Sequence, residues 1–267
     1  MSEERYFATK TEDAFELERL GYMQKMCNPI TFRRLQTLGL RPGWRCLEVG
    51  AGEGTVARWL AQQVGEQGRV VATDVNPRFL RGLDLPQLEV RAHHIVEDEL
   101  EHGHYDLVHC RAVLGHLAEP GKALARMRAA VRPGGWLCVE EGDYGAWAAV
   151  DWESSAGEHF NRSFRAVLAG LHKKGIMNPY FGRLTPGLLD GCEQVERGHE
   201  GSTEVCRGTE AGAQFHRMAL AVVRPAFIAA GVLTESDFAA LERGFTDPSF
   251  AFIGVTLFGA WGRRPCF

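Results

Sequence analysis

The sequence predicts an α/β fold, in which a mostly parallel sheet carries helices on both of its faces. Between residues 45 and 140, five short apolar runs alternate with stretches of helical periodicity. Strands that alternate with helices form parallel sheets, because each helix returns the chain to the same edge. A glycine-rich turn follows the first apolar run, and an acidic residue closes the second. Such strand ends meet at one edge of a parallel sheet, where ligands bind.

The apolar runs give the expected strands, and the periodic stretches give the helices. We expect strands over residues 45–49, 69–73, 88–92, 105–110 and 136–140, and helices over 56–64 and 120–131. Residues 11–39 also have helical spacing, but they contain Asn28-Pro29. Because proline interrupts helices, we expect two N-terminal helices there.

The alternation ends after Asp143. The elements expected beyond it are a helix over 155–173, a strand over 201–208, helices over 210–230 and 234–243, and a closing strand over 250–261. Thr234 is the predicted N-cap of the last helix, with Asp237 as its acidic partner, which is a relative of the capping box.

The length of 267 residues suits one domain with additional segments. We expect an N-terminal helical cap over 1–40 and a core built from 41–144 and 191–267. Residues 145–190 are rich in aromatic side chains. We expect them to form a helical insertion that acts as a lid over the strand ends.

Composition excludes several classes of protein. A net charge of −4 gives no general attraction to nucleic acid or to an anionic membrane. The polar N-terminus precedes no apolar stretch of the kind found in secretory signals, and no run is long enough to span a membrane. Seven scattered cysteines without a C-x-x-C pair favour reduced thiols in a cytoplasmic protein.

The turn after the first strand has the pattern of a nucleotide-binding loop. Glu48 ends the strand, and Gly50, Gly52 and Gly54 follow before a helix begins. Glycines let the backbone approach a ligand closely, and the helix N-terminus supplies amide donors. Asp74, at the end of the second strand, can accept hydrogen bonds from both hydroxyls of a ribose.

The spacing of the glycines distinguishes between two kinds of ligand. A dinucleotide motif, G-x-G-x-x-G, would place its third glycine at position 55, which is Thr55. Here the third glycine is Gly54, and an acid precedes the first glycine by two residues. This pattern resembles the first motif of class I methyltransferases, which bind S-adenosylmethionine in a Rossmann-like domain. An NAD-dependent oxidoreductase is the alternative that Thr55 disfavours.

The resemblance continues in order over roughly residues 40–143. Tyr105-Asp106-Leu107-Val108 is similar to the fourth-strand motif of the family. Val113-Leu114-Gly115-His116-Leu117 and Arg132-Pro133-Gly134-Gly135 resemble segments of the ubiquinone-biosynthesis-like, small-molecule members. The resemblance implies a seven-stranded, mostly parallel sheet with an antiparallel last strand.

The resemblance also implies the residues that bind the cofactor. They are Glu48, Gly50, Ala51, Gly52, Thr55, Asp74, Val75, His94, Ile95, Cys110, Arg111 and Tyr22. His94 departs from the family pattern, which has an acid at this position. Arg111 would offer its backbone carbonyl to the amine of the cofactor, and Tyr22 would close over it.

Six of the ten histidines lie between residues 93 and 116. A metal site is one interpretation, but no H-E-x-x-H pair is present, so we expect no metal. His116 and His109 lie near the end of the fourth strand, and Asp143 lies near the end of the fifth. We take these three as the candidate catalytic residues, since an imidazole can act as a base near neutral pH. The alternative is that they are structural.

An aromatic group in the insertion could line the pocket for the methyl acceptor. Its members are Tyr144, Trp147, Phe164, Tyr180 and Phe181. The alternative is that they pack the insertion onto the sheet. We therefore expect methyl transfer to a small organic molecule, such as a specialised metabolite. A cofactor-binding protein without methyl transfer is a further alternative. We expect no nucleic-acid or membrane partner, and a homodimer is a possible assembly.

Overall fold

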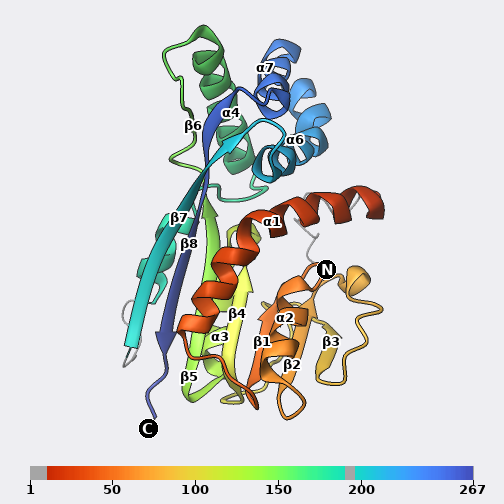
Figure 1. Ribbon diagram of the computed structural model, residues 1–267, viewed down its shortest axis with the longest axis vertical. Coiled ribbons are helices and arrows are strands. Elements are labelled where there is room, and N and C mark those ends of the chain that lie inside the picture. Colours follow the sequence, from red (N-terminus) through yellow and green to blue (C-terminus); the bar gives the residue numbers. More distant parts are fainter. Residues whose placement is uncertain (1–10, 190–195, 267) are drawn as a thin grey trace. The chain divides into compact units, whose positions relative to one another are not determined.

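The computed structural model describes residues 11–189 and 196–266 (Figure 1). Within them, the strands form one sheet in the order β3-β2-β1-β4-β5-β8-β6, and β7 pairs with β8. The strands are β1 Arg45–Val49, β2 Arg69–Asp74, β3 Leu88–Ala92, β4 Tyr105–Arg111, β5 Val131–Asp143, β6 Ala148–Ala149, β7 Glu196–Arg207 and β8 Ala251–Arg263.

The first five strands pair in parallel, which confirms the predicted α/β fold. The late strand β8 runs antiparallel to β6. Strand order reverses between β1 and β4, because the chain first adds β2 and β3 on one side of β1 and then returns to the other. The sheet has eight strands among the described residues, rather than seven. The additional strand β6 has only two residues, which is too short for sequence periodicity to reveal.

The helices connect and cover these strands. They are α1 Asp13–Thr37, α2 Thr55–Val64, α3 Pro120–Ala130, α4 Ser155–Lys173, α5 Thr185–Leu188, α6 Ala211–Ala229 and α7 Glu235–Thr246, with short 3-10 helices η1 Pro77–Phe79, η2 Leu114–His116 and η3 Gly182–Leu184. The predicted capping box of α7, between Thr234 and Asp237, is confirmed. In the described part of the chain, no helix has both the length and the apolar character that a membrane crossing requires.

The prediction of two N-terminal helices was wrong, because α1 is a single helix with Pro29 inside it. A proline in a helix removes one backbone hydrogen bond and clashes with the preceding turn. Burial on both sides offsets this cost, since Met26, Leu35 and Leu38 are each no more than 7% exposed. Each such side chain contributes about 1.5–3 kcal/mol when it leaves water.

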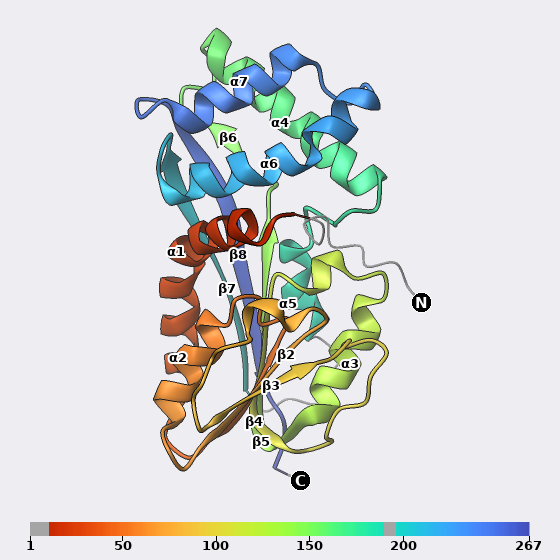
Figure 2. The same ribbon diagram turned by 90° about the vertical axis from the view of Figure 1, so that its right-hand side faces the viewer.

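The described residues divide into two compact units. The sheet unit contains the described parts of 28–141, 181–201 and 258–267, and the helical unit contains those of 1–27, 142–180 and 202–257. In the sheet unit, α2 covers one face of the sheet and α3 covers the other (Figure 2). Leu60 of α2 and Met127 of α3 are fully buried in two separate clusters. Both faces of the sheet therefore make apolar contacts with a helix.

The helical unit has its own core, which combines aromatic rings with aliphatic side chains of α4, α6, α7 and the segments around them. Trp147 stacks on Phe164, with ring centroids 3.8 Å apart, and Phe160 packs edge-on against Phe245 at 5.4 Å. Aromatic pairs contribute about 0.5–1.5 kcal/mol beyond the area they bury. The domain boundaries expected at residues 40, 144 and 190 stay a prediction.

Candidate functional site

The glycine loop forms a tight turn between β1 and α2. Gly50, Gly52 and Gly54 all have positive φ, at 69°, 57° and 81°, which L side chains rarely adopt. A Cβ on Gly50 would lie 2.4 Å from Cγ2 of Val113, so this position has no room for a side chain. A Cβ on Gly52 would meet no atom within 4 Å. The loop is thus packed against Val113 at Gly50, whereas it has free space beside Gly52.

Asp74 lies beside this loop. Its Oδ2 accepts a hydrogen bond of 2.9 Å from the backbone N–H of Gly52, and its Oδ1 accepts one of 2.9 Å from Asn76. The two residues meet because β1 and β2 are parallel neighbours, so their carboxyl ends share one edge of the sheet. The glycine loop and the ribose-binding acid that the sequence predicts are therefore adjacent.

The N-terminus of α2 is uncapped. Its N-cap residue is Gly54, which has no side chain to accept from the first turn, and that turn contains no acidic residue. The amides of such a turn carry partial positive charge. Asn28 of α1 reaches this point, since its Nδ2 lies 3.4 Å from Oγ1 of Thr55. An anionic ligand group would be stabilised here.

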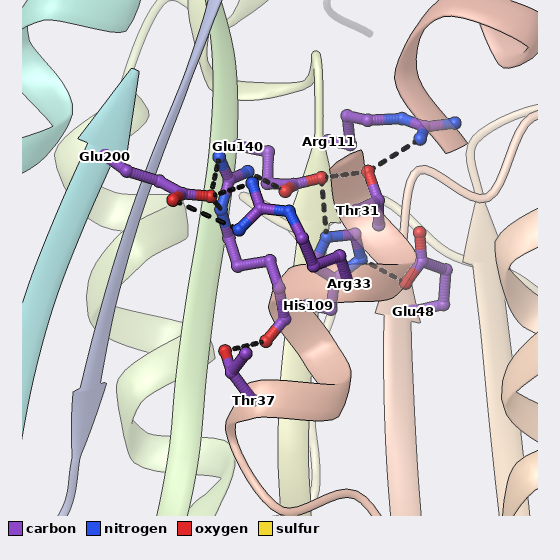
Figure 3. Close-up of polar contacts among 9 residues, drawn as sticks. Thr31, Arg33, Thr37, Glu48, His109, Arg111, Glu140 and Glu200 are labelled. Atoms are coloured by element: carbon purple, nitrogen blue, oxygen red, sulfur yellow. Dashed lines mark hydrogen bonds and ion pairs between the residues drawn. The ribbon is translucent and has the colours of Figure 1, made fainter. Parts of the chain in front are cut away.

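A buried polar network lies beside the loop (Figure 3). His109 of β4 is fully buried, and its Nδ1 lies 2.6 Å from Oε2 of Glu48, while its Nε2 lies 3.4 Å from Oε2 of Glu140. Burial alone would lower the pKa of His109, but the charges and hydrogen bonds of Glu48 and Glu140 raise it to about 9. At neutral pH this side chain is therefore an imidazolium held between two carboxylates.

The role of His109 as a general base stays a prediction, which this geometry disfavours. A protonated imidazole has no lone pair with which to accept a proton, and both ring nitrogens already face carboxylates. The sequence correctly predicts that His109 lies on the fourth strand. It cannot show that Glu48 of β1 and Glu140 of β5 lie on either side of the ring. Glu48 in turn faces His109, which is the partner that the structure records for its carboxylate.

Glu140 extends the network to α1. It accepts a hydrogen bond from Thr31 and pairs with Arg34, whose side chain is also fully buried. Burial would raise the pKa of Glu140, but His109 and the nearby arginines lower it to about 2. Arg34 also lies 3.0 Å from Glu200 of β7, and Glu200 pairs with Arg33. Glu140 is thus ionised and fully surrounded.

Glu141, the next residue, faces a different partner. Its carboxylate accepts backbone N–H groups from Val113 at 2.9 Å, Leu114 at 2.6 Å and Gly115 at 3.3 Å. Burial raises its pKa to about 7, although these hydrogen bonds oppose the shift. The sequence alone does not predict this role for Glu141. Two consecutive acids at the end of a buried strand were the available signal, because neighbouring residues of a strand point to opposite faces.

His116 ends the short helix η2, directly after the three amides that Glu141 holds. Its ring is half-buried. Asp143 is buried, and its Oδ1 accepts a hydrogen bond of 2.7 Å from the N–H of Gly145. His116 belongs to the sheet unit and Asp143 to the helical unit. Their catalytic roles stay predictions.

The other predicted cofactor residues occupy varied positions. Val75 is 46% exposed directly after Asp74, and Ile95 is buried in the core. Nδ1 of His94 accepts the N–H of Val96 at 3.3 Å. Cys110 is fully buried within β4, so only its backbone can face a ligand there. Tyr22 belongs to the helical unit, and its ring lies 5.1 Å from the ammonium of Lys25.

The predicted aromatic acceptor group is divided between the two units. Tyr144, Trp147, Phe164 and Tyr180 pack in or against the core of the helical unit. Phe181 packs in the core of the sheet unit. This arrangement supports the alternative role in packing, since Trp147 and Phe164 are no more than 6% exposed. In the ranges that the structure covers, no group of three or more His, Cys, Asp or Glu side chains could hold a metal ion.

Comparisons with known proteins agree with this geometry. A family model described as a methyltransferase domain matches residues 47–137, from the first strand through the fifth. Methyltransferase str2 of Strobilurus tenacellus is 26% identical over 72% of this chain and 68% of its own length. The ubiquinone/menaquinone biosynthesis C-methyltransferase of Ralstonia pickettii is 32% identical over 38% of this chain and 44% of its own.

A solved structure shares the fold. Phosphoethanolamine N-methyltransferase 2 of Haemonchus contortus, in complex with phosphomonomethylethanolamine and S-adenosylhomocysteine, superposes with a TM-score of 0.59 at 15% identity. The alignment covers 97% of this chain and 60% of that one. Among the first curated relatives, the chain spans from 33% to 68% of their length.

Proposed function

We propose that this chain is a class I S-adenosylmethionine-dependent methyltransferase, which transfers the methyl group of that cofactor to a small organic acceptor. One observation carries the proposal. The glycine loop and Asp74 lie at the same sheet edge, joined by the hydrogen bond from Gly52. A ribose beside Asp74 would then have its adjoining amino-acid portion over the loop.

The described residues fit this cofactor. Gly50 has no room for a Cβ, whereas Gly52 faces open space, as a backbone cradle for a ligand requires. Asp74 supplies the carboxylate for the ribose, and the uncapped α2 supplies amide donors. Thr55, in place of a third dinucleotide glycine, disfavours NAD.

When bound, the sulfonium of the cofactor supplies an already activated methyl group. The protein therefore contributes mainly by positioning the donor and acceptor atoms in line. Glu141 fixes the backbone of residues 113–115 and so orients His116. Where the acceptor atom carries a proton, His116 is our candidate for the base that removes it.

A small organic acceptor, such as a specialised metabolite, is supported by two observations. One curated relative is a C-methyltransferase of quinone biosynthesis, and quinone precursors are small organic molecules. The net charge of −4 gives no general attraction to nucleic acid. The free cysteines of the described chain suit a reducing compartment, so we propose a cytoplasmic location.

Calorimetry with S-adenosylhomocysteine tests the donor half of this proposal. We expect binding to the wild-type protein and no binding of NAD. Asp74→Ala should weaken the binding by about 1–3 kcal/mol, which is the scale of lost hydrogen bonds to a charged group. Asp84→Ala, which changes an exposed aspartate further along the same connection, should bind as the wild type does.

Transfer of a labelled methyl group to a panel of phenols, amines and quinone precursors tests the acceptor half. Tight cofactor binding with no turnover on any acceptor would leave a cofactor-binding protein in place of a methyltransferase. If the protein binds NAD but not S-adenosylhomocysteine, the glycine loop is a dinucleotide-binding loop instead.

A further inference from the structure

Arg111 is a buried cation that sits directly beside the glycine loop. It is the last residue of β4 and only 8% exposed. Its Nη1 donates to Oγ1 of Thr31 at 2.8 Å, and its Nη2 donates to Oδ1 of Asn28 at 2.9 Å. Both acceptors are neutral. Within the described ranges, no carboxylate lies at ion-pair distance from this guanidinium.

The surrounding network offsets this charge only in part. It contains three carboxylates, from Glu48, Glu140 and Glu200, and four cations (Figure 3). His109 lies between Glu48 and Glu140, while Arg33 and Arg34 pair with Glu200 and Glu140. Thr31 separates Arg111 from Glu140, because its hydroxyl accepts from the guanidinium and donates to the carboxylate. Glu140 thus acts on Arg111 only across this hydroxyl and is shared with other cations, so the guanidinium has no directly paired carboxylate among the described residues.

A buried cation without a directly paired carboxylate is costly, and a ligand that supplies negative charge lowers this cost. A guanidinium has five N–H donors, and its two hydrogen bonds to α1 use two of them. The remaining donors suit a carboxylate, which arginine binds in a bidentate manner. Arg111 also lies at the carboxyl end of β4, beside the point where strand order reverses, which is where ligands bind in such sheets.

A second positive feature converges on the same place. Asn28 accepts from Arg111 and, through its amide nitrogen, contacts Thr55, the first residue of α2. The guanidinium is thus connected through one side chain to the uncapped N-terminus of α2. Two independent sources of positive potential, a side-chain charge and a helix end, therefore flank the glycine loop.

We propose that the guanidinium of Arg111 binds the carboxylate of the amino-acid portion of the cofactor, with the N-terminus of α2 as a second donor. The inference rests on the proposed function, because it assigns a role within the cofactor site. It differs from the family-based expectation for Arg111, which concerned its backbone carbonyl. It also explains why α1 turns Asn28 and Thr31 toward Arg111, since both neutral acceptors orient the guanidinium without neutralising it.

Two probes that differ only by the carboxylate test this role. They are S-adenosylhomocysteine and its decarboxylated analogue, and the affinity of each is measured by calorimetry. We expect the wild-type protein to bind the analogue about 10- to 100-fold more weakly, as the loss of a charge-assisted bond implies. R111Q should weaken the binding of S-adenosylhomocysteine by a similar factor. Its affinity for the decarboxylated analogue should stay within about twofold of the wild-type value. R111K should recover part of the loss.

The controls separate this contact from a structural effect. R33Q removes an exposed arginine from the same network and should leave both affinities unchanged. If R111Q weakens both probes equally, Arg111 only supports the fold of the loop, and the inference is wrong. If R111Q does not fold, the wild-type protein alone still tests the inference. Equal affinities of the wild type for the two probes would then show that the inference is wrong. If the wild type binds neither probe, the proposed function itself fails.

Discussion

At the scale of single residues, Glu140 and Glu141 show how environment separates two identical side chains. They are neighbours at the end of one strand, yet the pKa of Glu140 falls to about 2 and that of Glu141 rises to about 7. Both side chains are buried, and burial by itself would raise the pKa of each. Glu140 faces His109 and Arg34, whereas Glu141 faces only backbone amides. The sequence shows both acids but cannot show which cations the sheet places beside each.

His109 should stabilise the protein only while it is protonated. Its pKa of about 9 lies above the ordinary value of 6.5. The stabilisation is therefore complete below about pH 6.5 and is lost as the pH rises through about 9. His109→Gln leaves two buried carboxylates without this cation, so we expect a loss of about 3–5 kcal/mol at neutral pH.

Urea unfolding of both proteins between pH 6 and 10 checks this prediction. The difference in unfolding free energy should shrink as the pH rises, because the wild type loses its advantage. His159→Gln is the matched control, since His159 pairs with Asp237 where both side chains are only half-buried. Pairs that solvent reaches contribute about 0–1 kcal/mol. A difference that does not vary with pH would show that His109 is neutral in the folded protein.

At the scale of elements, local patterns predicted most strands and helices. The expected strand over 45–49 is β1, and the expected helix over 155–173 is α4. Elements that depend on distant contacts were less predictable. Strand β7 begins at Glu196 rather than Gly201, because its pairing with β8 extends it through a polar stretch without alternation. The position of α1 likewise depends on Glu140 and Glu200, which lie far away in sequence.

The glycine loop and helix η2 should behave as one element. Gly50→Ala brings a Cβ to 2.4 Å from Cγ2 of Val113, whose backbone N–H is held by Glu141. A β-branched side chain has little freedom to turn away. We expect a destabilisation of about 2–4 kcal/mol, from the positive φ and the steric contact together. Affinity for S-adenosylhomocysteine should fall at least tenfold.

Gly103→Ala separates the two causes. Gly103 has a φ of 61°, close to that of Gly50, but a Cβ there meets no atom within 4 Å. We expect it to cost only the backbone penalty of about 1–2 kcal/mol, with unchanged affinity. Thermal unfolding and calorimetry measure the two effects. Equal losses in both variants would mean that the loop tolerates the contact with Val113.

At the scale of the whole molecule, the two compact units could not be derived from the sequence. Residues 202–257 share a unit with 142–180 because α7 packs against both α4 and α6. Those contacts join segments that are far apart in the chain, and no local pattern marks them. The donor half of the site was more predictable, since the glycine loop and Asp74 are each defined by a few consecutive residues. The acceptor half has no comparable motif.

Every residue to which we assign cofactor binding on geometric grounds, from the glycine loop to Arg111, belongs to the sheet unit. A defect in the core of the helical unit should therefore lower stability without changing cofactor affinity. Phe245 is fully buried among Phe160, Trp147 and Phe252. Phe245→Ala should cost about 3–5 kcal/mol, while the dissociation constant for S-adenosylhomocysteine stays within about twofold at a temperature where the protein is folded.

Leu60→Ala provides the opposite case. Leu60 is fully buried on α2, the helix that the glycine loop enters. A cavity there should cost about 2–5 kcal/mol and should also weaken cofactor binding, because α2 would no longer hold the loop rigidly. Thermal unfolding with and without S-adenosylhomocysteine, together with calorimetry, distinguishes the two variants. If Phe245→Ala weakens binding as much as Leu60→Ala does, residues of the helical unit must contribute to the cofactor site.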